Sequence, residues 1–182
     1  LGKKIYITGK GRCNVTNGCD VEDFFGHVVT NGKFLYSAVY GFTNQDVMDL
    51  LEECGCPLKI ERGERVFPVS DKSSDVISAL AGKLRKERVS VYLNEPVKEI
   101  LTEDGRAVGI LLEKSGRRVP ADAVIVTTGG LSYPATGSTG DGYRFARELG
   151  HTVTALSPAL VPFVCAEEDV KRLQGLSLRN IE

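Results

Sequence analysis

The residues best suited to binding chemistry lie in two glycine-rich segments, residues 9–17 and 129–142. In the first segment, the Arg12 guanidinium offers a planar fork of donors for a phosphate or a flavin carbonyl. The Asn14 amide next to it supplies both a donor and an acceptor. The glycine spacing does not match Gly-x-Gly-x-x-Gly. A solvated turn with a structural arginine therefore explains this segment equally well.

The second segment follows residues 123–127, a continuous apolar run with β-branched side chains. Such a run predicts a fully buried strand, typically parallel. Ligands of open α/β sheets bind beyond the carboxyl ends of the strands, and consecutive glycines let the backbone approach them closely. Residues 140–142 predict a helix start, whose free N–H groups suit a phosphate or an electron-rich ring. An ordinary glycine-rich loop and helix cap fit this segment as well.

The elements that must position these segments follow from periodicity. Apolar spacing predicts helices at 44–53, capped by Asn44, and from Ser73 or Ser74 to about residue 87. A further helix is expected at 140–149 and a helical turn at 21–25. Alternating patterns predict a hairpin, a single strand and an antiparallel meander. The hairpin would use residues 58–62 and 65–69, the strand 89–93, and the meander 97–102, 107–113 and 117–120.

Composition narrows the partners. The formal net charge of the 182 residues is −1, so nothing indicates an electrostatic attraction to nucleic acid or to an anionic membrane. No apolar stretch approaches the length of a membrane span. The five cysteines favour a reducing cytoplasm over a disulfide framework, and their spacing matches no standard zinc module. We therefore expect a cytoplasmic protein with a small-molecule substrate, no nucleic-acid or membrane partner and no metal.

Two long motifs together resemble one family. KKIYITGKGRCNVTN at 3–17 and GGLSYPATGSTGDGY at 129–143 closely resemble the YhiN/BaiN-type flavoproteins, bacterial proteins of the glutathione-reductase-like FAD superfamily. Shorter segments of the chain also resemble that family, at residues 34–38, 44–46, 65–72 and 94–97. Several motifs in the correct order make the resemblance specific, and it spans nearly the whole chain.

The resemblance implies a cofactor, FAD, with NAD(P)H as a candidate co-substrate, and it implies which residues bind the cofactor. The first segment would lie beside the pyrophosphate and flavin, Val97 would meet adenine through its backbone, and the turn at 128–130 would be the second FAD fingerprint. The implied cofactor-binding residues are Gly9, Gly11, Arg12, Cys13, Asn14, Val97, Thr128, Gly129, Gly130 and Asp141. No catalytic constellation is evident, which suits an enzyme whose cofactor carries the chemistry.

The expected fold class is α/β, a partial FAD-binding domain with an antiparallel meander and a small α+β insertion. Residues 1–30 and 88–150 would belong to the FAD-binding domain, 31–87 to the insertion, and 151–182 to the start of a substrate-side domain. The family's N-terminal Gly-x-Gly-x-x-Gly unit would end just before Leu1, so the chain looks like a fragment truncated at both ends.

The expected activity is that of an FAD-dependent oxidoreductase, with hydride transfer through flavin N5 between NAD(P)H or an organic substrate and an acceptor. Two alternatives stay open. One is a non-catalytic fragment or binding module that keeps the fold but not FAD. The other is a purely nicotinamide-dependent dehydrogenase, although this would need a Gly-x-Gly-x-x-Gly motif that the chain does not show. No motif indicates the substrate, the preference for NADH or NADPH, or the oligomeric state.

Overall fold

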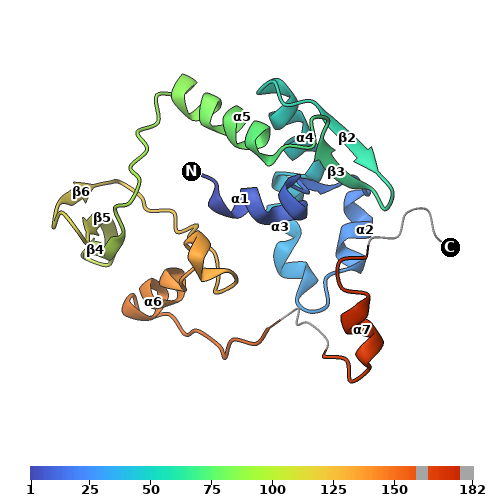
Figure 1. The fold of residues 1–182 in the computed structure, drawn as a ribbon. Helices are drawn as coiled ribbons and strands as arrows, with labels where there is room; N and C mark the ends of the chain where they lie inside the picture. The colour runs from blue at the N-terminus through green and yellow to red at the C-terminus, as the bar shows by residue number, and fades with distance from the viewer. Residues whose placement is uncertain (159–163, 177–182) are drawn as a thin grey trace.

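The computed structural model describes residues 1–158 and 164–176, and Figure 1 shows their arrangement. The fold class is confirmed: helices combine with two small antiparallel sheets. No helix in this part of the chain is both long and apolar enough to cross a bilayer. Residues 159–163 and 177–182 lie outside the described residues, so the further domain predicted at 151–182 is described only in part; it includes helix α7 (Glu168–Arg172).

The N-terminal part is built on a three-stranded sheet in the order β1-β3-β2. The predicted hairpin is confirmed as β2 (Leu58–Glu61) and β3 (Arg65–Pro68), and the short strand β1 (Thr16–Asn17) pairs antiparallel with β3. The hairpin closes over Gly63 and Glu64, which both have positive φ (73° and 56°), as right-twisted hairpins favour.

Helices pack against this sheet. The predicted helices are confirmed as α2 (Val21–Gly26), α4 (Asn44–Glu53) and α5 (Ser73–Lys86). They are joined by α1 (Lys3–Ile7) and α3 (Tyr36–Gly41), and by two 3-10 helices, η1 (Thr8–Gly11) and η2 (Gly32–Leu35). The core cluster of this part consists of Cys13, Leu51, Cys56 and Val76, with Ile5, Val15, Leu58, Ala79 and Leu80 packed against it.

The helix caps differ from the predicted ones. Thr43, not Asn44, caps α4, because its hydroxyl accepts from the Asp46 N–H while the Asp46 carboxylate accepts from the Thr43 N–H. This reciprocal capping box satisfies two N–H groups at the helix start. Lys72 takes the cap position of α5, and Ser73 is buried in its first turn. The Asn44 amide is used elsewhere, in the wall of a pocket described below.

The predicted meander is also confirmed. It consists of β4 (Val97–Glu103), β5 (Arg106–Leu112) and β6 (Arg118–Pro120), paired antiparallel in that order. Asp104 and Gly105 turn between the first two strands with positive φ. Gly109 lets β6 approach, since a Cβ there would lie 2.3 Å from the Val119 carbonyl oxygen.

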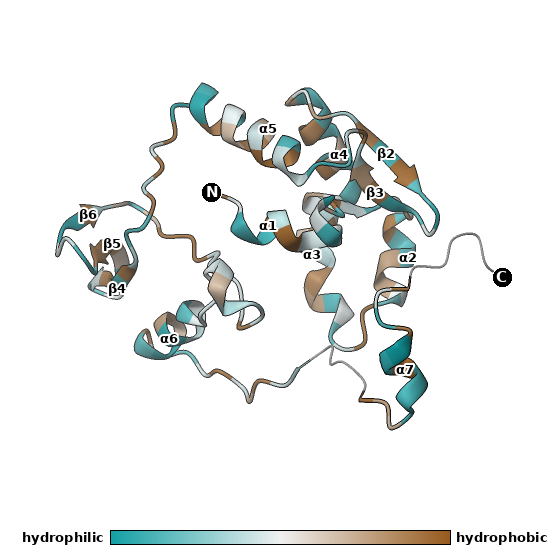
Figure 2. Ribbon diagram, in the orientation of Figure 1, coloured by the Kyte–Doolittle hydropathy of each residue, from teal (hydrophilic) through white to brown (hydrophobic). Residues whose placement is uncertain are grey.

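Two predicted strands are wrong. Residues 89–93 and 123–127 form no strand, and Ile125 is 86% exposed. A strand needs a neighbour for its N–H and C=O groups, and within the described ranges neither segment has one. The second segment is part of the connection between β6 and helix α6 (Asp141–Glu148), and Figure 2 shows hydrophobic residues in that connection. Helix α6 confirms the helix predicted at 140–149.

Candidate cofactor site

The first glycine-rich segment folds against the β2–β3 hairpin. Gly9 has a φ of 55°, and a Cβ there would lie 2.7 Å from the Asn14 nitrogen and 3.1 Å from a ring carbon of Phe67. Packing inside the chain therefore requires Gly9. Gly11 also has a positive φ, of 87°, but a Cβ there would lie 3.9 Å from the Tyr6 carbonyl oxygen, which is an ordinary contact distance.

Arg12 is held by two acids of the hairpin region. Its Nη2 lies 2.5 Å from Glu61 Oε1 and 2.6 Å from Asp71 Oδ1, and its guanidinium lies 4.0 Å from the centre of the Phe67 ring. Lys59 Nζ joins the cluster at 2.8 Å from Asp71 Oδ2. Hydrogen bonds to Glu61 and Asp71 raise the pKa of Arg12, and the hydrogen bond from Arg12 lowers the pKa of Glu61. This side chain therefore already has anionic partners within the protein.

The next two predicted residues, buried Cys13 and exposed Asn14, also contact the rest of the chain. Cys13 is 6% exposed and has a φ of 62°, and burial raises the pKa of its thiol. The Asn14 amide, with its nitrogen turned toward the sheet, donates to the carbonyls of Thr16 at 3.0 Å and Val66 at 3.2 Å. The structure thus brings the first five predicted residues together, but the side chains of Arg12, Cys13 and Asn14 secure the loop to the hairpin and the core.

The second segment packs on the start of α6. A Cβ on Gly129 would lie 2.8 Å from Ser138 Oγ, and one on Gly142 would lie 3.0 Å from Thr128 Oγ1. A Cβ on Gly130 would lie 3.2 Å from the Tyr143 hydroxyl. A Cβ at Gly129 would force Ser138 to shift, and those at Gly142 and Gly130 would make tight contacts, so glycine suits all three positions. The predicted turn at 128–130 and the predicted helix start therefore meet as expected.

Five backbone donors gather at this junction. The N–H groups of residues 128–130, and those of Asp141 and Gly142, form no hydrogen bond within residues 1–158 and 164–176. Thr128 and Gly129 are exposed. Free N–H groups beside a helix start favour an electron-rich or anionic ligand. The Asp141 carboxylate in the same turn accepts a hydrogen bond from Thr139 Oγ1 at 2.8 Å.

Arg144 joins the remaining two predicted residues. Its Nη2 donates to the Val97 carbonyl at 3.3 Å and to Asp141 Oδ1 at 3.2 Å, and its Nη1 donates to the Lys98 carbonyl at 2.7 Å. Glu148 completes the contacts of this guanidinium at 3.0 Å. Sequence reasoning missed Arg144, although acids three positions before it and four after it are the spacing of helical ion pairs.

The two halves of the predicted site are joined by Lys4. Its Nζ on α1 donates to the Ser132 carbonyl at 2.6 Å, across 128 positions of sequence. This contact links the helix that leads into Gly9 with the loop that follows Gly130. No local pattern could have indicated this pairing, nor that of Arg12 with Glu61 and Asp71.

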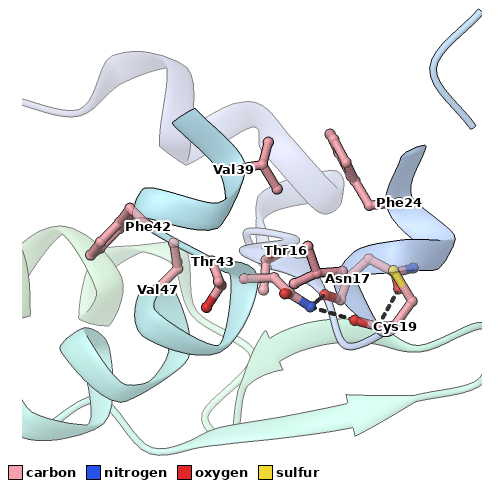
Figure 3. Close-up of a pocket in the computed structure, with 10 residues that line it drawn as sticks. Thr16, Asn17, Cys19, Phe24, Val39, Phe42, Thr43 and Val47 are labelled. Carbon is pink, nitrogen blue, oxygen red and sulfur yellow. Dashed lines mark hydrogen bonds between the residues drawn. The ribbon is translucent and has the colours of Figure 1, made fainter. Parts of the chain in front are cut away.

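A separate pocket opens beside the end of the first segment (Figure 3). Its volume is about 280 Å³. Figure 3 shows Val39 and Phe24 on the opposite side of this pocket from Asn17 and Cys19. The lining consists of Thr16, Asn17, Cys19, Val21, Phe24, Val39, Phe42, Thr43, Asn44 and Val47.

The family model described as "HI0933-like protein Rossmann domain" matches residues 1–180. The chain is 34% identical over 177 residues to the 3-dehydro-bile acid delta(4,6)-reductase of Clostridium scindens. The matched region is 97% of this chain and 42% of that protein.

Two further relatives carry a different name. The chain is 30% identical over 176 residues to the ribosomal RNA dihydrouridine synthase of Escherichia coli, covering 97% of this chain and 42% of that protein. It is 29% identical over 182 residues to the protein of the same name in Haemophilus influenzae, and this match covers 98% of this chain and 44% of that protein. The chain thus spans less than half the length of the relatives it matches.

Proposed function

Because the chain belongs to the HI0933-like Rossmann-domain family, as its two long motifs predict, we propose that it forms part of an FAD-dependent oxidoreductase. In this proposal FAD lies along the junction of the 128–130 turn, α6 and the start of β4. The bound cofactor would supply hydride transfer through flavin N5, with NAD(P)H or an organic substrate as the donor.

The observation that carries the proposal is the group of free N–H donors at residues 128–130, 141 and 142. Gly129 and Gly130 lie close to Ser138 and Tyr143, so these donors already stand beside the start of α6 and binding would require little rearrangement. In this arrangement the N–H groups hold an electron-rich part of FAD, the Val97 backbone lies at the adenine side, and the Asp141 carboxylate accepts a hydrogen bond from a hydroxyl group of the cofactor.

The first segment has a different role from the one its residue types suggest. Since Arg12 and Asn14 are held by the hairpin, we propose that they position the loop and that its backbone, at Gly9 to Gly11, faces the cofactor. Gly11 suits this role because a Cβ there would approach only the Tyr6 carbonyl oxygen, at 3.9 Å.

The reaction class is proposed from the relatives' names. One is called a delta(4,6)-reductase and the others dihydrouridine synthases. Both descriptions fit the addition of hydrogen to a double bond of a ring. We propose the same class here, in which one ring carbon receives a hydride and its neighbour a proton. The expectation that no nucleic acid is involved stays a prediction, since two relatives are named for ribosomal RNA.

A second candidate, a binding module that does not retain FAD, is favoured by the engagement of Arg12 with Glu61 and Asp71. A titration separates the two candidates. FAD is added to the purified chain, and flavin fluorescence is followed together with the absorption band near ~450 nm. The proposed site predicts saturable quenching, which Asp141→Asn weakens.

Asp169→Asn is the matched control for that titration. Asp169 lies in the first turn of α7 and pairs with Arg172 three positions later, as Asp141 pairs with Arg144 in α6. Equal weakening by both variants would show a general loss of helix stability. Absence of quenching with the unmodified chain would favour the binding module.

A further inference from the structure

We propose that the pocket between β1, α2, α3 and α4 is a binding site for a neutral, mostly apolar ring compound that carries one hydrogen-bond donor. The pocket is distinct from the FAD junction proposed above, which involves residues 97 and 128–142. None of its lining residues belongs to that junction. The inference therefore stands or falls independently of flavin binding.

The walls of the pocket are apolar and held in place. Val21 and Phe24 come from α2, Val39 from α3 and Val47 from α4. The two helices α2 and α3 are tied by stacked and edge-on aromatic contacts, with the Phe25 ring 4.4 Å from that of Tyr36 and 5.6 Å from that of Tyr40. Phe24 and Phe42 also line the pocket and are 38% and 54% exposed.

The polar side of the pocket is a fixed network. The Asn44 amide nitrogen donates to the carbonyls of Asn17 at 2.8 Å and Cys19 at 2.7 Å. Asn17 Oδ1 accepts from the Cys19 N–H at 2.9 Å, and its amide nitrogen donates to the Gly63 carbonyl at 3.1 Å. Both Asn44 amide hydrogens are thus used, which fixes the direction of its oxygen.

Acceptors remain in this network. Neither Asn44 Oδ1 nor Thr16 Oγ1 forms a hydrogen bond in the described part of the chain, although both residues are half-buried. An amide oxygen in a half-buried pocket loses hydration when a ligand enters, so a ligand with a donor in that position binds better than one without. The Asn44 oxygen, which can only accept, therefore selects for one N–H or O–H group.

Charge and size define the rest of the ligand. No lining residue carries a charge, so an ionised ligand would lose hydration without an ionic partner. The volume of about 280 Å³ is near the lower end for small-molecule sites, which suits a compound of about two or three rings. Phe24 and Phe42 in the lining supply edges and faces for aromatic contact.

The test uses N-phenyl-1-naphthylamine, a neutral aromatic amine with one N–H whose fluorescence rises in apolar surroundings. We expect saturable binding to the chain. The N-methylated analogue, which has the same rings and no donor, should bind about fivefold more weakly, as the loss of one hydrogen bond predicts. Equal affinities of the two probes would contradict the role of the Asn44 oxygen.

Cys19 reports on the location of the probe. Its half-buried thiol lines the pocket, whereas Cys165 is exposed elsewhere in the chain. Saturating probe should slow alkylation of Cys19 by iodoacetamide about fivefold or more and leave Cys165 unchanged, as measured by peptide mass spectrometry. Binding that leaves the alkylation rate of Cys19 unchanged would overturn the assignment.

A pocket-filling variant completes the test. Val39→Trp places a large ring in the cavity and should weaken the probe about tenfold or more. Val29→Trp is the matched control, because Val29 is 96% exposed and does not line the pocket. If Val39→Trp does not fold, the Cys19 protection measured with the unmodified chain still decides the proposal.

Discussion

Arg144 of α6 donates a hydrogen bond to the backbone carbonyl of Val97, which lies 47 positions earlier at the start of β4. The same guanidinium holds Asp141 and the Lys98 carbonyl. One side chain therefore fixes the meander, the helix start and the predicted adenine-side residue relative to one another. The rigid, planar fork of arginine, with five N–H donors, suits this arrangement better than the compact ammonium of lysine.

Arg144→Met should lower the free energy of unfolding by about 1–2 kcal/mol, because two carbonyls and two carboxylates lose their donor. Arg144→Lys should recover only part of this loss. Arg147→Met is the control: Arg147 is exposed on the same helix, and its replacement should change stability by less than about 0.5 kcal/mol. Urea unfolding measures all three variants. Equal effects at positions 144 and 147 would contradict a joining role for Arg144.

The cluster around Arg12 should make stability depend on pH. Its hydrogen bonds lower the pKa of Glu61, and those of Lys59 and Arg12 lower the pKa of Asp71. A carboxyl whose pKa is lower in the folded state stabilises the fold above its unfolded pKa, about 4, and this stability is lost as the pH falls through the folded value. The urea concentration at the unfolding midpoint should therefore decrease as the pH is lowered below about 4.

Arg12→Met should reduce that fall, because the two carboxyls then titrate closer to their unfolded values. Other acids with lowered pKa, such as Asp46, are unchanged and give the same background in both proteins. Arg62→Met, at an exposed hairpin position, serves as the control and should retain the full pH dependence. An unchanged midpoint profile for Arg12→Met would show that the ion pairs do not contribute.

Local patterns predicted most of the elements. Helices α4, α5 and α6, the hairpin and the meander all follow from apolar spacing and turn residues within a few positions of one another. Residues 89–93 and 123–127 have equally strong strand patterns, yet form no strand. Such a pattern predicts a buried strand, and a buried strand needs a neighbouring strand to pair with. The described residues provide no neighbour for either segment.

The candidate site, too, could be predicted from the sequence only in part. The turn at 128–130 and the start of α6 are adjacent in sequence, so their meeting could be predicted. The ion pairs of Arg12 span 49 and 59 positions, and an arginine that binds a carboxylate in its own chain has the same sequence signal as one that binds a phosphate. Residue type alone therefore could not distinguish an anchor for the loop from an anchor for the cofactor.

Gly129 and Gly137 provide a matched pair for testing the second segment. Both have positive φ, 74° and 104°, but a Cβ would meet Ser138 Oγ at 2.8 Å only at Gly129. Alanine at either position should cost about 1 kcal/mol from the backbone alone. Gly129→Ala should cost about 1 kcal/mol more, because Ser138 is 4% exposed and has little room to move.

Ser138→Ala provides the check on that explanation. Removing the hydroxyl should recover most of the additional loss in Gly129→Ala and none of the loss in Gly137→Ala. The double-mutant cycle is measured by thermal or urea unfolding. Independence of positions 129 and 138 would mean that the turn does not pack on the helix start as described.

The exposed run at 123–127 gives the sharpest contrast with the sequence pattern. Ile125 is 86% exposed and Ile100, in β4, is 7% exposed. Ile100→Ala should lower the free energy of unfolding by about 2–4 kcal/mol, because it removes buried methyl groups and leaves a cavity. Ile125→Ala should change it by less than about 0.5 kcal/mol, because its side chain is already in water. A large loss at position 125 would mean that the run is buried as a strand after all, since only burial makes an isoleucine side chain contribute that much.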